Sequence, residues 1–448
     1  MMDDDHRVLA GLKVFELSVA VAAPCAGRYL AYHGADVVKV ESRVNPDVAR
    51  LFGSAWARTE EYAPLFMDTS PYLPEMTAGK RSIGLELKDA DALAAAHKLI
   101  EGCDVFLSNF TPDALERMGM SYAQLHPVNP RLIHVVMPGF GAEPALPYYP
   151  FRAFGPNQAP LVGLDALTGH PGEEPAGIAS VAPPDYVAGM HAVVSVLSAL
   201  EHRDQTGDGS SVVISQMETT VSLLGPFLVD HAITGRTPEP SGNRIPWAAP
   251  TGVYRSLGHD RWVALSVAGD VQWAALVALV GGDALTDPAW ATLEGRLAAH
   301  DAIDEAVGVW TAAISPAEAA ARLQGAGIAA YEVLDHRGVL TDPQLRDRKV
   351  YDVAPSVRFG RDLFTGHPIR MTDTPASVPW AGPNMGQHTR EILVNRVGLS
   401  EPEVDALMER GAAFGERVPE MTVRRPFDPW YEIVGLVGDD APSSGKAS

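Results

Sequence analysis

The sequence contains little cysteine: Cys25 and Cys103 are the only two in 448 residues. Neither lies in a CxxC motif or a Cys/His cluster, so the sequence indicates no disulfide framework and no metal site. Two buried thiols in a reducing compartment are the simpler interpretation, and we expect a cytoplasmic protein. A basic signal-peptide region is missing, and charged residues and a proline interrupt the most apolar early stretch, residues 15–32. We therefore predict no membrane-spanning segment.

Positive charge is also scarce: 35 Lys and Arg residues stand against 56 Asp and Glu, for a formal net charge of −21. This balance argues against nucleic acid or an anionic membrane as a partner, because phosphate groups bind clustered Lys and Arg. An anionic ligand would need a locally basic site on this acidic protein. Hydrophobic residues make up 46% of the chain and charged residues 20%, which is typical of a globular protein with a large core.

A GxGxxG motif is missing after the first apolar run, so nothing in the sequence indicates a bound dinucleotide. Short apolar runs alternate with helical patterns through the first part of the chain. They predict strands at 12–17, 36–41, 81–87, 104–107 and 132–137, and helices at 22–32 and 89–101. Strands and helices at this spacing form right-handed βαβ units. We therefore predict an α/β fold, a doubly wound, mostly parallel, Rossmann-like large domain.

The pattern changes after residue 183. Residues 186–201 predict a helix whose apolar side would comprise Val187, Met190, Val193, Val194, Leu197 and Leu200. A strand is predicted at 211–214. Beyond it, shorter strands such as 262–267 and two or three helices indicate a smaller α+β domain, with Trp247 and Tyr254 in its core.

The C-terminal part is rich in proline and predicts irregular structure from 343 to 386, followed by helices at 389–396 and 401–410. The whole chain then divides into the first part of the large domain (1–225), the small domain (226–340), a linker and return to the large domain (341–437) and a disordered tail (438–448).

Several segments carry a resemblance to a known family. They include LAGLKVFELSVAVAAP from Leu9, then YLAYHGADVVKVE, GKRSIGLELK, DVFLSNFTPDALERMGMSYAQL, NPRLIHVVMPGFG and PPDYVAGMHAVVSVLSALEHRDQTGDGSSVVIS. In this order they resemble the family III CoA-transferases, the group that contains formyl-CoA transferase, carnitine CoA-transferase and the α-methylacyl-CoA racemases. The resemblance extends from about Leu9 to Arg410. It implies an interlocked homodimer that acts on an acyl-CoA and a carboxylic acid, with CoA as substrate and no metal.

Asp185 is the residue to which the resemblance gives a chemical role. By position alone it would be a helix N-cap, because Asp is a preferred cap and an apolar-periodic helix follows it. The segment DYVAGMH, however, stands where the family has its nucleophilic aspartate. The two roles are compatible, since a helix N-terminus would keep the carboxylate ionised. The resemblance thus implies transfer through an aspartyl-CoA intermediate on Asp185.

The resemblance also implies a set of CoA-binding residues: Arg43, Leu85, Lys88, Asn109, Phe110, Arg117, Met118 and Arg152. Its basic members would supply the local positive charge that an anionic cofactor needs. Without the resemblance, Lys88 and Arg152 would be interpreted as solvated surface charges, since most Lys and Arg side chains are exposed.

Three positions depart from the family pattern. Val21 replaces a glutamine, and Phe154–Gly155 replaces a His–Asp pair of the racemases or the acidic residue of many transferases. We expect Val21, Phe154 and Gly155 to line a more apolar acyl pocket. His191 falls six residues after Asp185, so we expect it to face elsewhere and to serve in packing.

Three functions are therefore compared. The leading interpretation is a CoA-transferase for a medium-sized or hydrophobic carboxylic acid. An α-methylacyl-CoA racemase or other isomerase is disfavoured, because the histidine that would act as base is missing. A non-catalytic CoA-binding protein of the same fold is the third, and the presence of Asp185 argues against it.

Overall fold

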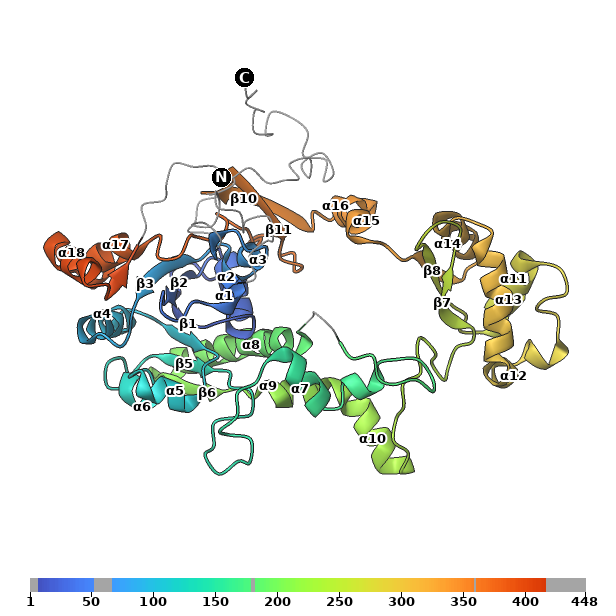
Figure 1. The fold of residues 1–448 in the computed structure, drawn as a ribbon, viewed down its shortest axis with the longest axis horizontal. Coiled ribbons are helices and arrows are strands. Elements are labelled where there is room, and N and C mark those ends of the chain that lie inside the picture. The colour runs from blue at the N-terminus through green and yellow to red at the C-terminus, as the bar shows by residue number, and fades with distance from the viewer. Residues whose placement is uncertain (1–6, 52–66, 179–181, 358–359, 416–448) are drawn as a thin grey trace, which may run out of the picture. The chain divides into compact units, whose positions relative to one another are not determined.

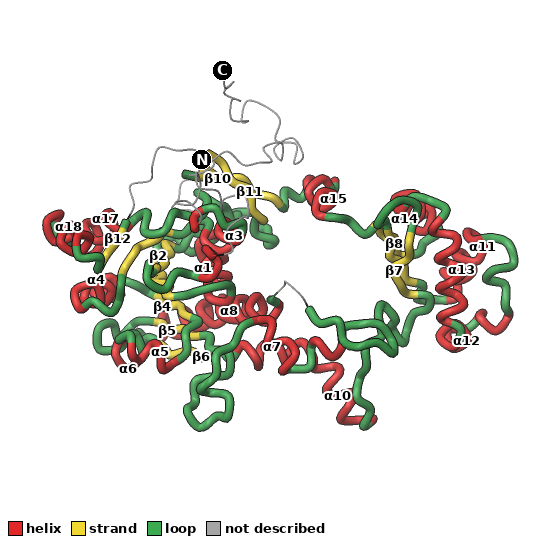
Figure 2. The backbone as a smooth tube through the Cα atoms, viewed as in Figure 1, coloured by secondary structure: helices red, strands yellow, loops and turns green. Residues whose placement is uncertain are grey.

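The computed structural model describes residues 7–51, 67–178, 182–357 and 360–415. Its described residues form two compact units, shown as a ribbon in Figure 1 and as a tube in Figure 2. The first unit holds the residues up to 162, those from 182 to 226 and those from 341 onward. The second holds residues 163–178 and 227–340. Residues 163–178, which the sequence analysis included in the large domain, thus cluster with the second unit. The predicted tail, 438–448, lies outside the described residues.

A seven-stranded sheet forms the centre of the first unit, with the order β12-β3-β2-β1-β4-β5-β6 in the part of the chain that is described. Its strands are β1 (Lys13–Leu17), β2 (Asp36–Glu41), β3 (Arg81–Leu85), β4 (Val105–Ser108), β5 (Ile133–Val136), β6 (Ser210–Val213) and β12 (Ala413–Phe414). All neighbours pair in parallel except β12, which is antiparallel to β3. The predicted doubly wound and mostly parallel sheet is confirmed.

Helices cover both faces of this sheet. Alternate side chains of a strand point to opposite faces, so Val14 of β1 packs with one layer and Phe15 with the other. Val14 joins a core with α1 (Ala22–Tyr32) and α8 (Pro183–Thr206). Phe15 joins a core with α4 (Ala90–Glu101), α5 (Pro112–Arg117) and α18 (Glu401–Glu409).

The buried face of α8 differs from the predicted one. Its buried residues lie on a face of small side chains: Ala188, Gly189, Ala192, Val196 and Ala199. A Cβ atom added at Gly189 would lie 2.8 Å from the carbonyl oxygen of Ala22, so α8 and α1 approach backbone to backbone. Larger side chains would separate the helices. The predicted apolar side was therefore wrong in part: Val193 and Leu200 pack against this core, but Met190, Val194 and Leu197 are exposed by 50%, 65% and 44%.

The second unit has its own core. An antiparallel sheet, β7 (Thr251–Arg255), β8 (Trp262–Ser266) and β9 (Ala329–Glu332), packs with α11 (Asp270–Val280), α13 (His300–Ala312) and α14 (Pro316–Gly325). Tyr254 is buried in this core as predicted, but Trp247 is 66% exposed and is not a core residue. Two further helices of this region are α10 (Gly225–Thr234) and α12 (Leu293–Ala298).

The segment after residue 341 contains more regular structure than predicted. An antiparallel hairpin, β10 (Tyr351–Ser356) and β11 (Gly360–Thr365), lies where the sequence indicated loops. The predicted helix at 389–396 is α17 (Thr389–Ile392), continued by a π-helical turn, Leu393–Val397. The remaining short helices are α2 (Val48–Leu51), α3 (Tyr72–Thr77), α6 (Tyr122–Leu125), α7 (Gly155–Leu161), α9 (Gln216–Val221), α15 (His336–Thr341) and α16 (Pro343–Asp347). Within the described ranges, the helices are all too short or too polar to cross a lipid bilayer.

Candidate functional site

The strand order of the sheet indicates where a site would lie. The order runs outward in one direction through β1, β2 and β3 and in the other through β4, β5 and β6, so it reverses between β1 and β4. In open α/β sheets, ligands bind beside the carboxyl ends of the strands at this reversal. The loop after β1 and the loop after β4 meet there. The side-chain amide of Asn109 accepts a hydrogen bond from the N–H of Val19 (3.0 Å) and donates one to its carbonyl oxygen (2.7 Å).

Asp185 lies at this edge of the sheet. It is the third residue of α8, whose N-cap position is taken by Ala182, so the N-cap assignment was wrong by three residues. The backbone N–H of Ala22, the first residue of α1, and the N–H of Asp185 itself both act to lower the pKa of this carboxyl group. The first turns of two helices therefore meet at this carboxyl group.

The environment of Asp185 is largely apolar. The residue is 7% exposed, and its Oδ2 atom is buried without a hydrogen-bond partner among the described residues. Burial raises the pKa of Asp185 to about 6, although the N–H groups of Asp185 and Ala22 oppose the shift. The backbone N–H groups at the helix N-termini favour the ionised form, as expected, but desolvation has the larger effect on the pKa. The group is thus a carboxylate of raised basicity that titrates just below neutral pH.

Gly155 contacts this carboxyl group from α7. A Cβ atom added at Gly155 would lie 2.7 Å from Oδ2 of Asp185 and 2.7 Å from the Cβ of Ala182. No side chain fits between them in this arrangement, so the glycine permits the close approach of α7 and α8. Of the other predicted pocket residues, Val21 is the half-buried N-cap of α1, next to Ala22, and Phe154 is 59% exposed beside Gly155.

A buried network of charges lies behind the loop after β1. The ammonium group of Lys39 pairs with Oδ2 of Asp47 at 3.0 Å and donates to the carbonyl oxygen of Ser18 at 2.8 Å. Glu16 lies 3.5 Å from Lys39 and receives a 2.6 Å bond from Lys80, which is fully buried. Burial lowers the pKa of Lys80 to about 8, with Glu16 opposing the shift. The sequence analysis did not identify this network.

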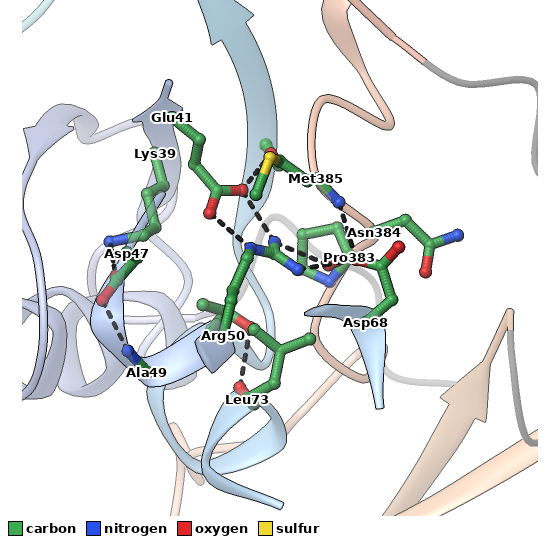
Figure 3. Close-up of polar contacts among 12 residues, drawn as sticks. Lys39, Glu41, Asp47, Ala49, Arg50, Asp68, Leu73, Pro383, Asn384 and Met385 are labelled. Atoms are coloured by element: carbon green, nitrogen blue, oxygen red, sulfur yellow. Dashed lines mark hydrogen bonds and ion pairs between the residues drawn. The ribbon is translucent and has the colours of Figure 1, made fainter. Parts of the chain in front are cut away.

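A second part of the network is centred on Arg50, which is fully buried (Figure 3). Its guanidinium bonds both oxygens of Glu41, at 2.6 and 2.7 Å, and Oδ1 of Asp68 at 2.7 Å. It also donates to the carbonyl oxygen of Pro383. This arginine therefore joins β2 to the chain that returns after residue 341, and its role is structural.

The predicted CoA-binding cations are all exposed: Arg43, Lys88, Arg117 and Arg152. Arg43 lines a cavity of about 310 Å³ together with Glu86 and Phe414, and its guanidinium carbon lies 4.5 Å from the centre of the Phe414 ring. The cavity is bordered by the ends of β2, β3 and β12.

The uncharged members of the predicted CoA-binding set lie deeper. Leu85 is 1% exposed and packs in the core, which Phe110 and Met118 also contact. Asn109 uses its amide to hold Val19, as described above.

His191 faces away from Asp185, but it is exposed and not a packing residue; its Nδ1 lies 2.8 Å from the carbonyl oxygen of Val187. Cys25 and Cys103 are buried free thiols, as expected. In the part of the chain that the structure describes, no three His, Cys, Asp or Glu side chains are grouped as metal ligands.

Comparisons with known proteins identify the family of this chain. The model of CoA-transferase family III matches residues 9–389. The succinyl-CoA–D-citramalate CoA-transferase of Chloroflexus aurantiacus is 28% identical over 405 residues, which cover 90% of this chain and 98% of that protein. The formyl-CoA:oxalate CoA-transferase of Streptomyces avermitilis is 26% identical over 423 residues, covering 90% and 99%. A crystal structure of a CaiB/BaiF family protein from Brucella suis matches with a TM-score of 0.78 at 27% identity, over 86% of this chain and 98% of that one.

Proposed function

Because the chain belongs to CoA-transferase family III and is a CoA-transferase, we propose that it moves CoA from an acyl-CoA to a carboxylic acid through covalent intermediates on Asp185. The observation that carries the proposal is the carboxyl group of Asp185, which lies at the first turns of α1 and α8 with one oxygen that has no partner among the described residues. Such a group is desolvated and sits where the fold binds ligands.

The proposed reaction has four steps. An Asp185 oxygen attacks the thioester carbonyl, and CoA thiolate leaves, giving a mixed anhydride. The thiolate attacks the aspartyl carbonyl and releases the donor carboxylate, which leaves an aspartyl-CoA thioester on the enzyme. The acceptor carboxylate attacks this thioester, expels CoA thiolate and forms a second anhydride. The thiolate then attacks the acceptor's carbonyl, which gives the new acyl-CoA and restores Asp185.

The environment of Asp185 suits each of these steps. A carboxylate of raised pKa is a better nucleophile than an ordinary one and is still mostly ionised at pH 7. The first N–H groups of α1 have no partner within the helix, and they can stabilise the oxyanion of each tetrahedral intermediate. The residue is 7% exposed, and Gly155 and Ala182 lie on the side of Oδ2.

We expect ion pairs between basic side chains and the phosphate groups to bind CoA. The exposed guanidinium and ammonium groups of Arg43, Lys88, Arg117 and Arg152 can pair with the phosphate groups of CoA in a protein of net charge −21. Val21, Phe154 and Gly155 near Asp185 carry no charge, so we propose a medium-sized or hydrophobic acyl group. The racemase reaction remains disfavoured, because Phe154–Gly155 provides no base.

We propose a second copy of this chain, in an interlocked homodimer, as the partner. The outward face of α8 supports this, because Met190, Val194 and Leu197 expose a row of large apolar side chains one turn apart. The two free buried thiols fit the cytoplasm, which is the location we propose.

The covalent intermediate provides the test. The protein is incubated with a panel of acyl-CoA thioesters and then with hydroxylamine or borohydride, and its peptides are analysed by mass spectrometry. We expect a modified peptide containing Asp185 in the wild type and none in D185N. A racemase would instead introduce solvent deuterium at the α-carbon without an adduct, and a binding protein would show neither; both results contradict the proposal.

A further inference from the structure

The loop between β1 and α1 is held by side chains at three successive residues. Lys39 bonds the carbonyl oxygen and hydroxyl of Ser18, at 2.8 and 3.0 Å. Asn109 bonds the N–H and carbonyl oxygen of Val19. Asp47 accepts a 2.7 Å hydrogen bond from the N–H of Ala20. These three side chains come from β2, from the residue just after β4 and from the residue just before α2, so the loop is held by three different segments.

This loop contains a backbone conformation that alanine does not favour. Ala20 has a φ of +59°, in the left-handed region that residues with a Cβ atom rarely adopt. Such a conformation persists only where the surroundings impose it. The 2.7 Å bond to Asp47 does so directly, and the buried ion pair with Lys39 at 3.0 Å keeps the Asp47 carboxylate in place.

Two residues after Ala20, α1 begins, and its first residue packs against α8, the helix that carries Asp185: a Cβ atom added at Gly189 would lie 2.8 Å from the carbonyl oxygen of Ala22. The backbone N–H of Ala22 also lowers the pKa of Asp185. The conformation of Ala20 therefore sets the direction in which the N–H of Ala22 points. If Ala20 relaxed to an ordinary conformation, the first turn of α1 would move relative to the carboxyl group. The carbonyl oxygen of Pro24, in the same turn, is also held, by a 2.8 Å bond from Lys80.

We propose that Asp47, together with Lys39 and Asn109, is a positioning residue for the Asp185 carboxyl group. It holds Ala20 in the left-handed conformation and so keeps the first turn of α1 against Asp185. The inference rests on the proposed function, because it assigns these residues to the reaction of Asp185. They do not touch the reacting atoms themselves.

The test uses the full-length variants D47A, A20G and D47A/A20G. The rate at which an acyl-CoA modifies Asp185 in a single turnover is followed by quenching and mass spectrometry. We expect D47A to react about a hundredfold more slowly, because a displacement of about 1 Å at a reacting group has an effect of that size. KM for the acyl-CoA should change little, and the acid limb of the rate should move to higher pH, because Ala22 no longer favours the ionised form.

The second substitution separates positioning from stability. A20G alone should react at the wild-type rate, because glycine adopts the left-handed conformation without steric cost. In D47A/A20G the rate should recover by about tenfold, since the cost of that conformation is removed. If Asp47 only stabilised the fold, D47A would melt at a lower temperature but react normally per folded molecule. That result, or a failure of A20G to restore any rate, would overturn the inference.

Asp104 offers a matched control at the other end of β1. Its carboxylate also accepts from a β1 backbone N–H, that of Lys13 at 2.8 Å, and pairs with Arg203 at 3.0 Å. D104A should lose stability but keep its reaction rate, and an equal loss of rate in D104A and D47A would contradict the inference. Should D47A not fold, D47N keeps the shape but removes the charge facing Lys39; we expect a smaller slowing that A20G relieves.

The two proposals fail in different ways in this experiment. If the wild type forms no adduct on Asp185, the proposed function itself is wrong. If the wild type forms the adduct and folded D47A or D47N forms it equally fast, only the positioning role is wrong.

Discussion

Ala22 of α1 and Gly189 of α8 approach so closely that a Cβ atom added at Gly189 would lie 2.8 Å from the Ala22 carbonyl oxygen, and the backbone N–H of Ala22 lowers the pKa of Asp185 in the first turn of α8. Helix N-termini carry partial positive charge, so two of them favour the ionised form of this carboxyl. Burial acts in the opposite direction and is the larger effect. The result is a carboxylate that is ionised at neutral pH but more basic than a solvated aspartate.

The pH dependence of transfer should report this balance. In the proposed reaction the carboxyl group of Asp185 must be ionised to attack, so kcat/KM should rise with pH and level off above an apparent pKa of about 6, the value for Asp185. An exposed aspartate near its ordinary pKa of 3.8 would leave the rate flat above about pH 5. Initial rates between pH 4 and 8, at saturating acceptor, distinguish the two.

The same raised pKa predicts that D185N is more stable than the wild type. Because the folded pKa exceeds the unfolded one, the shift has no effect below pH 3.8, costs stability progressively up to pH 6 and is constant above. From 3.8 to about 6, the difference amounts to at most about 3 kcal/mol. Urea unfolding of both proteins at pH 3.5 and pH 7 measures it. Equal differences at both pH values would contradict the assigned environment of Asp185.

Much of the large domain could be predicted from the sequence. Its strands are short apolar runs, and the helices between them have a clear apolar periodicity. The hairpin formed by β10 and β11 could not be predicted in this way. Its strands include Pro355, Arg361 and Asp362 and lack an alternating apolar pattern, and pairing with each other stabilises them. The face of α8 also escaped prediction. Periodicity groups Met190, Val194 and Leu197 on one side, but it does not show that a backbone contact at Gly189 selects the opposite side for burial.

Only those residues of the candidate site that belong to a recognisable sequence motif could be predicted. The family resemblance identified Asp185 as the candidate nucleophile, and this role stays a prediction. Gly155 was noted as a departure from the family pattern, but its contact with the Asp185 carboxyl group was not predicted. No pattern in the sequence indicated the buried ion pairs that hold the loop after β1. Lys39 lies within the apolar strand Asp36–Glu41, and its partners Glu16 and Asp47 belong to other segments. Alternation places Lys39 on one face of β2, but only the fold shows that this face is buried.

The outward face of α8 predicts the effect of a charge on assembly. Val194 is 65% exposed, so V194E should not weaken the folded chain. In the proposed homodimer it would bury a carboxylate, so we expect a shift to monomer in sedimentation velocity. V271E is the control, because Val271 is 87% exposed on α11, in the second unit. Identical sedimentation of V194E and the wild type would argue against α8 as the dimer interface.

Arg43 predicts a contribution to CoA affinity. Its guanidinium lies over Phe414 beside a cavity, where it can pair with a phosphate group. We expect R43A to raise the Kd of CoA by about tenfold or more, in line with the loss of one charge-assisted hydrogen bond. The salt dependence of binding should also become less steep. Titration calorimetry at two salt concentrations tests both effects, with K98A as control, because Lys98 is exposed on α4 and pairs with Glu101. If the Kd of CoA is the same for R43A and the wild type, Arg43 does not bind CoA.

Replacing Gly155 by alanine should slow the reaction, because it adds a methyl group next to the Asp185 carboxyl group. In G155A the new Cβ would lie 2.7 Å from Oδ2 of Asp185, so the carboxyl or the first turn of α7 must move. Overpacking of this kind costs about 1–3 kcal/mol of stability, and a carboxyl displaced by about 1 Å should react about a hundredfold more slowly. We expect G155A to fold, to bind CoA normally and to form the Asp185 adduct slowly.

A matched glycine in the second unit separates the contact from the substitution. Gly308 lies inside α13 with nothing within 4 Å of an added Cβ, so G308A should gain about 1 kcal/mol from helix propensity and keep full activity. Adduct formation in a single turnover, unfolding in urea and CoA titration are measured for both variants. If G155A reacts as fast as G308A, then the methyl group fits beside the Asp185 carboxyl group without displacing it. The apolar, close-packed environment assigned to the nucleophile would then be wrong.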